Sequence, residues 1–237
     1  MSQIAHTSSA FAQDLEDLNM GVVRLGQMAS RQLNACLRAM SDFQVRRVDM
    51  LIERDIELDE LEAQVNEKVL QIITVRAPRA EDLRRVLAAA KAAQSLERIG
   101  DYARNTAKRT KAIMASDAGD LPWDQLIEIG TMVAAMIDDV IVAHQQGDLD
   151  AAQAIRNSDV HVDKLHTAFF GAVIADMEAG TMPPLVGAHL LFMGKNLERI
   201  GDFTTSLAEQ VLFIETGEPV ETSRPKADRT SWMIDEG

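Results

Sequence analysis

The sequence feature that most constrains this chain is a short motif that occurs twice. LERIGDY at Leu96–Tyr102 recurs as LERIGDF at Leu197–Phe203. Six consecutive identities can arise by chance in a helix rich in Ala and Glu, but Ile-Gly-Asp is not typical of such a sequence. An internal repeat of this kind indicates that one structural unit occurs twice in the chain.

The repeat extends upstream of both motifs. Asp55 and Asp59 precede the first copy, and Asp159 and Asp163 precede the second at nearly the same separation. Each half of the chain therefore carries related residues on two separate segments. We expect the same order of elements in both halves.

Those elements are expected to be helices. Hydrophobic residues make up 46% of the chain but aromatic residues only 4%, and apolar residues recur at spacings of three and four, as on one face of a helix. Glycine and proline cluster at a few places, where they would end helices. We predict six long helices, at about residues 8–40, 42–72, 78–115, 123–145, 148–178 and 184–217.

The predicted fold class is therefore all-α, with three helices repeated once. The stretch SDAGDLP at Ser116–Pro122 is the best candidate for a domain boundary. We assign residues 1–117 to a first three-helix bundle and residues 118–217 to a second. Residues 218–237 lack helical periodicity and are expected to form a flexible tail.

Acidic pairs form the candidate site. Glu97 and Asp101 lie four residues apart, as do Glu198 and Asp202, so each pair shares one face of a helix. The upstream aspartates have the same spacing, and like charges so placed destabilise a helix unless a cation lies between them. If neighbouring helices pack side by side, four carboxylates meet in each half. The predicted metal ligands are Asp55, Asp59, Glu97, Asp101, Asp159, Asp163, Glu198 and Asp202.

The helical pattern predicts that these clusters are open to solvent, because Glu97 and Asp101 fall away from the centre of the apolar face. Oxygen ligands favour magnesium, calcium or manganese, and carboxylate-bridged iron is also compatible. Glu62 and His166 follow the aspartates at equivalent positions and are possible additional ligands. For any single acidic pair, a solvated charge stripe is the alternative interpretation.

Two glycines inside the repeated motifs, Gly100 and Gly201, support a special site, since glycine within a helix costs about 1 kcal/mol relative to alanine. Close approach of another helix would explain them equally well.

Composition and missing motifs exclude several classes of protein. A net charge of −13 argues against nucleic-acid binding, which requires clustered basic residues. The chain shows no secretory signal and no apolar run long enough for membrane insertion, and its single cysteine, Cys36, suits a reducing compartment. We therefore expect a cytoplasmic protein. Phosphate-binding loops, nucleophile elbows and the Glu-x-x-His motif of di-iron bundles are all missing, so we expect no enzyme.

The two LERIGD motifs, each preceded by paired aspartates, resemble the signature of the PhoU family of phosphate-signalling regulators. The resemblance covers nearly the whole chain and includes the first helix, FAQDLEDLNMGVVRLGQMA. The second copy departs after LERIGD, reading FTTSLAEQ where the first reads YARNTAKR. Asn105 and Lys108 therefore have no counterparts in the second half.

The resemblance implies two three-helix bundles related by pseudo-twofold symmetry, assembled as a homodimer. It implies metal clusters of iron, zinc, manganese or magnesium on the eight carboxylates named above. It also implies a non-catalytic negative regulator of the phosphate-starvation response and of phosphate uptake, whose partners are the ATP-binding subunit of the phosphate ABC transporter and the sensor histidine kinase. The alternatives are a metal-free helical scaffold and a metal-dependent phosphate-ester hydrolase.

Overall fold

The computed structural model describes residues 2–42, 48–50, 55–116, 121–220 and 226–232, with side chains left undescribed at 2–8, 55 and 232. Six long helices make up most of this part of the chain, and no strand occurs in it. The helices are α1 (Ser2–Asp42), α3 (Asp55–Arg76), α4 (Ala80–Met114), α5 (Trp123–Gln146), α6 (Leu149–Glu178) and α7 (Pro184–Thr216). A single 3-10 turn, η1 (Thr230–Trp232), follows near the C-terminus.

The glycine and proline signals placed the helix ends well. α5 ends at Gly147 and α7 at Gly217, both in the left-handed conformation (φ 63° and 74°), which glycine adopts without steric cost. Pro184 occupies the first position of α7, where its missing N–H has no helical partner in any case. Within the range of the second predicted helix, residues 48–50 are helical and α3 runs from Asp55 to Arg76; residues 43–47 and 51–54 lie outside the described part.

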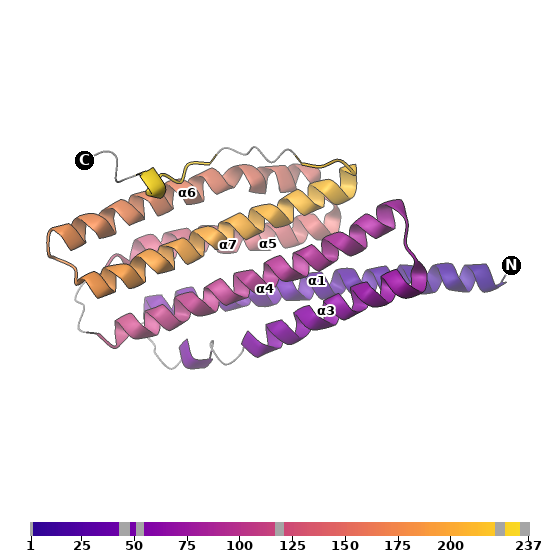
Figure 1. Ribbon diagram of the computed structural model, residues 1–237, viewed down its shortest axis with the longest axis horizontal. Coiled ribbons are helices and arrows are strands. Elements are labelled where there is room, and N and C mark those ends of the chain that lie inside the picture. Colours follow the sequence, from indigo (N-terminus) through magenta and orange to yellow (C-terminus); the bar gives the residue numbers. More distant parts are fainter. Residues whose placement is uncertain (1, 43–47, 51–54, 117–120, 221–225, 233–237) are drawn as a thin grey trace.

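The helices run alongside one another in one elongated bundle (Figure 1). α1, α3 and α4 pack against each other, and α5, α6 and α7 repeat that arrangement. The two sets meet through α1 against α5 and α4 against α7, so equivalent helices face each other. The predicted all-α fold of two three-helix units with pseudo-twofold symmetry is confirmed.

The two units share a single apolar core. Leu33 and Ile99 of the first unit and Ile137 and Leu190 of the second are fully buried in the same continuous cluster. The equivalent rings of the two repeated motifs, Tyr102 and Phe203, meet between α4 and α7 with their centroids 6.0 Å apart. The division at residues 117 and 118 lies outside the described part of the chain, so the assigned boundary stays a prediction.

Part of the C-terminal segment differs from the expectation of a free tail. Residues 226–232, which we name the strap, run back along α6 (Figure 1). The amide of Arg229 donates a hydrogen bond to Oγ1 of Thr167, 3.2 Å away on α6. Lack of periodicity therefore did not mean lack of structure here, because the strap is held by polar contacts rather than by a helical apolar face.

Among the described helices, none is long and apolar enough to cross a bilayer.

Candidate functional site

Close contact between the second and third helices of each unit positions the acidic residues. A Cβ at Gly100 would lie 3.0 Å from Cδ2 of Leu58 on α3. At Gly201 it would lie 3.3 Å from Oδ1 of Asp159 on α6. The glycines thus let each motif helix approach its neighbour, so close packing is sufficient to explain them.

In the first unit, this contact gathers Asp59 of α3 with Glu97 and Asp101 of α4, which we name the first cluster. Partial burial, the Asp101 carboxylate and the Asp59 carboxylate together raise the pKa of Glu97 to about 7, against a smaller opposite effect of Arg98. Burial and the same Asp101 carboxylate also raise the pKa of Asp59. The three carboxylates therefore lie close enough to repel one another, and their role as metal ligands stays a prediction.

Basic residues of α4 itself partly balance the first cluster. Arg104 donates a hydrogen bond from Nη2 to Oδ1 of Asp101 at 2.5 Å, and Nη1 of Arg98 lies 3.8 Å from the other oxygen of Asp101. Asp101 keeps about a fifth of its side chain exposed (22%). The first cluster is thus partly open to solvent, in line with the expected surface site. Asp55 begins α3, but its side chain is among those left undescribed.

The second unit gathers Asp159, Asp163 and His166 of α6 with Glu198 and Asp202 of α7, which we name the second cluster. Here the expectation of an open surface site is wrong. Asp159, Asp163, His166 and Glu198 are exposed by only 2%, 3%, 1% and 4%. Asp202 alone keeps partial exposure of its side chain. The helical wheel could not predict this, because it describes one helix at a time and does not show that the strap contacts Asp163 from a distant part of the chain.

Lys195 is the main counter-charge of the second cluster. Its Nζ lies 2.8 Å from Oε2 of Glu198 and 3.2 Å from Oδ2 of Asp228 in the strap. Burial alone would lower the pKa of Lys195, but the hydrogen bonds to these two carboxylates outweigh it and raise the pKa. Burial raises the pKa of Glu198, although Lys195 opposes that change. The ammonium group of Lys195 therefore occupies a position beside Glu198 that would also attract a metal cation.

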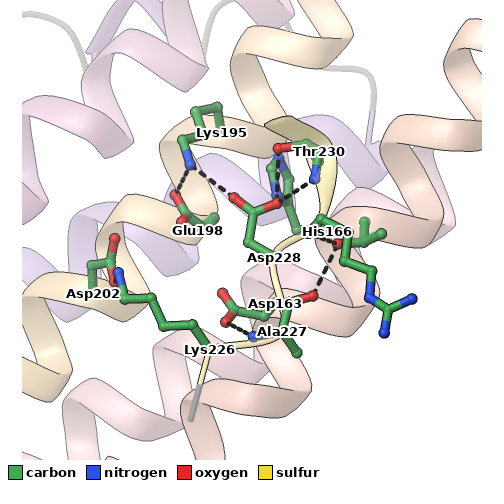
Figure 2. A network of polar contacts seen from close by, with 11 residues as sticks. Asp163, His166, Lys195, Glu198, Asp202, Lys226, Ala227, Asp228 and Thr230 are labelled. Carbon is green, nitrogen blue, oxygen red and sulfur yellow. Dashed lines mark hydrogen bonds and ion pairs between the residues drawn. The ribbon is translucent and has the colours of Figure 1, made fainter. Parts of the chain in front are cut away.

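The strap supplies further donors to the second cluster (Figure 2). The amide of Ala227 donates a hydrogen bond to Oδ2 of Asp163 at 2.7 Å. Nζ of Lys226 lies 3.6 Å from Oδ1 of Asp202. Asp228 accepts hydrogen bonds at Oδ1 from both the amide and the hydroxyl of Thr230, at 2.9 and 2.7 Å. Three of the proposed ligands therefore already have partners within the chain. Asp163 is paired with the Ala227 amide, Asp202 with Lys226, and Glu198 with Lys195.

The residues fit a hard or borderline cation by their chemistry. As the described side chains stand, no three of His, Asp, Glu or Cys are arranged around a common metal position, so binding would require the carboxylates to turn. Nδ1 of His166 is buried and has no hydrogen-bond partner among the described residues, and its nearest ionic neighbour, Oδ1 of Asp228, is 3.8 Å away. An orphaned nitrogen beside buried carboxylates is a donor set suited to a metal ion.

Sequence reasoning missed four residues of these sites: Arg104, Lys195, Lys226 and Asp228. Lys195 precedes Glu198 by three positions, a helical spacing that could have revealed it. Arg104 follows Asp101 by three positions, which is also a helical spacing. Lys226 and Asp228 gave no signal, because their segment has no repeat and no periodicity. Glu62 accepts a hydrogen bond from Nδ2 of Asn66, one turn further along α3. It differs in this from His166, whose Nδ1 has no hydrogen-bond partner among the described residues.

Comparison with known proteins places the chain in a family. Residues 22–110 and 126–211 match the PhoU domain, one stretch in each unit. The chain belongs to the PhoU family. The two PhoU matches coincide with the two repeats that the sequence showed, and each contains one LERIGD motif.

Curated relatives match over almost their whole length. The phosphate-specific transport system accessory protein PhoU homolog of Caulobacter vibrioides (strain NA1000 / CB15N) is 33% identical over 94% of this chain and 97% of its own. The homolog of Zymomonas mobilis is 36% identical over 95% of both chains. The crystal structure of PhoU from Pseudomonas aeruginosa superposes with a TM-score of 0.84 at 25% identity, covering 88% of this chain and 100% of that one.

Proposed function

We propose that this protein is a negative regulator of the phosphate-starvation response and a modulator of phosphate uptake. The observation that carries the proposal is the full-length match to relatives named as accessory proteins of the phosphate-specific transport system. The shared fold of two PhoU units supports it. A role as an adaptor between the ATP-binding subunit of the phosphate transporter and the sensor histidine kinase follows from the family resemblance, as does a homodimer.

We further propose that the two clusters bind metal ions. Asp59, Glu97 and Asp101 would hold the ion in the first unit, joined by Asp55. In the second unit the ligands would be Asp159, Asp163, Glu198 and Asp202, with His166 in addition. A divalent or trivalent cation would neutralise carboxylates that otherwise repel one another, and would thereby fix α3 against α4 and α6 against α7.

An adaptor role suits the surface chemistry of the protein. The net charge of −13 favours basic partner surfaces and speeds encounter with them. The residues that meet at the clusters are proposed ligands and their counter-charges, and the relatives are named as accessory proteins. The proposed role therefore depends on binding rather than on catalysis.

The regulatory role is tested in a strain that lacks the gene. We expect a reporter of phosphate-starvation genes to be active in high phosphate and to return to the repressed level when the wild-type gene is restored. A reporter that stays repressed without the gene contradicts the proposal. Restoring instead a gene with Glu97→Gln and Asp101→Asn asks whether repression also requires the first cluster.

The metal role is tested on protein purified without chelators. We expect bound metal by elemental analysis, reduced in the variant with Glu97→Gln and Asp101→Asn and reduced further when Asp163→Asn and Glu198→Gln are added. A metal-free helical scaffold is the second candidate, favoured by the side-chain positions that the described residues now adopt. Equal and negligible metal content in all three proteins would establish that alternative and would leave the regulatory role to be judged by the reporter.

A further inference from the structure

We propose that the strap and a metal ion compete for the second cluster, so that cation binding there releases residues 226–232 from α6 and α7. This inference rests on the proposed metal binding and adds to it a device that the first cluster does not share. It makes the two clusters unequal: one is open, and the other is governed by the C-terminal segment of the same chain.

The strap places a backbone amide on a carboxylate oxygen of the second cluster. The Ala227 amide nitrogen is 2.7 Å from Oδ2 of Asp163, and cations bind carboxylate oxygens at about 2.0 to 2.6 Å. Because Asp163 is exposed by only 3%, an ion on that oxygen and the amide would occupy overlapping space. Figure 2 shows the strap lying directly across Asp163, with Lys226 reaching toward Asp202.

The charge of the strap is opposite to that of the second cluster. Lys226, Asp228 and Arg229 give the strap a net positive charge, and it docks on a cluster of four carboxylates and one lysine. Buried carboxylates require compensation by opposite charge or hydrogen bonds. The strap supplies both, so it serves the cluster in the way that a bound cation would. Either partner relieves the same repulsion, and the two would exclude each other because both require the space at Oδ2 of Asp163.

Asp228 is the one carboxylate of the strap beside the second cluster, and its partners are residues of the chain. Its Oδ1 accepts two hydrogen bonds from Thr230, and its Oδ2 pairs with Lys195 at 3.2 Å. Both oxygens are therefore engaged within the strap and with the lysine. Asp228 holds the strap on Lys195 and thereby also keeps this lysine beside Glu198.

The first cluster provides the internal comparison. Its counter-charges, Arg98 and Arg104, belong to α4, the same helix as Glu97 and Asp101. They remain next to the carboxylates whatever the C-terminal segment does. Among the described residues, the second cluster alone draws donors from a segment that can leave without unfolding one of the long helices.

The test uses Mn²⁺ and the full-length protein with Glu97→Gln and Asp101→Asn, so that binding reports on the second cluster. Against this parent we compare Ala227→Pro, which removes the amide donor to Asp163, and a truncation after Val220. Free Mn²⁺ is followed by electron paramagnetic resonance. We expect both changes to tighten Mn²⁺ binding, the truncation by about tenfold, because the apparent affinity rises as the competent state becomes populated.

A second readout follows the strap itself. In the same parent, hydrogen exchange of the amides of Ala227 and Arg229 should accelerate at saturating Mn²⁺. It should not change when Asp163→Asn and Glu198→Gln are added. Glu218→Gln serves as a matched control for altered charge in the C-terminal segment and should leave both affinity and exchange unchanged.

Each outcome decides the inference. Weaker Mn²⁺ binding after truncation would mean that the strap supplies a ligand, and unchanged affinity with unchanged exchange would mean that it is a bystander; either result overturns the competition while the proposed metal role stands. Mn²⁺ binding to wild-type protein but to neither the parent nor its truncated form would confine the metal role to the first cluster and also overturn the inference. Absence of binding in wild-type protein would refute the metal role itself.

Discussion

In the first cluster, the pKa values of single carboxyl groups are raised above their ordinary values. Glu97 has its pKa raised to about 7 by partial burial and by the neighbouring carboxylates of Asp101 and Asp59. A carboxyl group that is protonated near neutral pH in the folded protein but ionised in the unfolded chain links stability to pH. Since the folded state binds the extra proton, the contribution of Glu97 to stability is greatest at low pH and falls as pH rises toward and through the raised pKa.

We predict that replacing Glu97 by Gln flattens this dependence. In metal-free protein, the change in the free energy of unfolding between pH 5 and pH 8 should be less favourable for the wild type than for the variant by about 1 kcal/mol, after allowance for solvent screening of a partly exposed group. Urea unfolding at both pH values measures the difference. Glu60→Gln, an exposed change on α3, should keep the wild-type slope; parallel slopes for Glu97→Gln would refute the electrostatic account.

Helices α4 and α7 form the contact that relates the two units. The rings of Tyr102 and Phe203, which hold the same position in the two motifs, meet there with centroids 6.0 Å apart. One turn further, the amide nitrogen of Asn196 donates to Oγ1 of Thr106 at 3.3 Å. The repeated motif therefore contributes to two contacts. Its acidic residues belong to a cluster, and its aromatic residue packs against the other unit.

We predict that Tyr102 and Phe203 are energetically coupled. Phe203→Ala should destabilise the protein by about 2 kcal/mol through lost burial. A double-mutant cycle with Tyr102→Ala should give a coupling energy of about 0.5 to 1.5 kcal/mol. Phe192→Ala on the same helix is the control, because this ring is 56% exposed and contacts the Arg109 guanidinium; its effect should stay below about 1 kcal/mol. A coupling energy near zero would show that the ring contact is incidental.

At the scale of the whole molecule, the two sequence repeats share one continuous apolar core. Buried residues of α1 and α4 belong to the same apolar cluster as those of α5 and α7. Separating the units would expose the faces through which α1 meets α5 and α4 meets α7. Repeat units of this kind bury part of their apolar surface only against a neighbour.

We predict that neither half folds alone. Residues 1–117 and 118–237, expressed separately, should show loss of cooperative thermal unfolding, whereas the intact chain should unfold in a single transition by circular dichroism and by calorimetry. Mixing the two fragments should restore part of the helical signal. Two independent transitions in the intact chain would instead indicate two autonomous domains.

The sequence by itself determined the helices, their approximate ends and their duplication, because helical periodicity, glycine and proline are local properties and a repeated motif is visible without a structure. It also identified residues that meet at the first cluster: Asp59, Glu97 and Asp101. The tertiary structure decided what surrounds them. Whether a carboxylate is open or buried, and which amide or lysine faces it, depends on segments distant in sequence. Residues 226–232 return to α6 and contact Asp163 of the second cluster, and no local pattern encodes that contact.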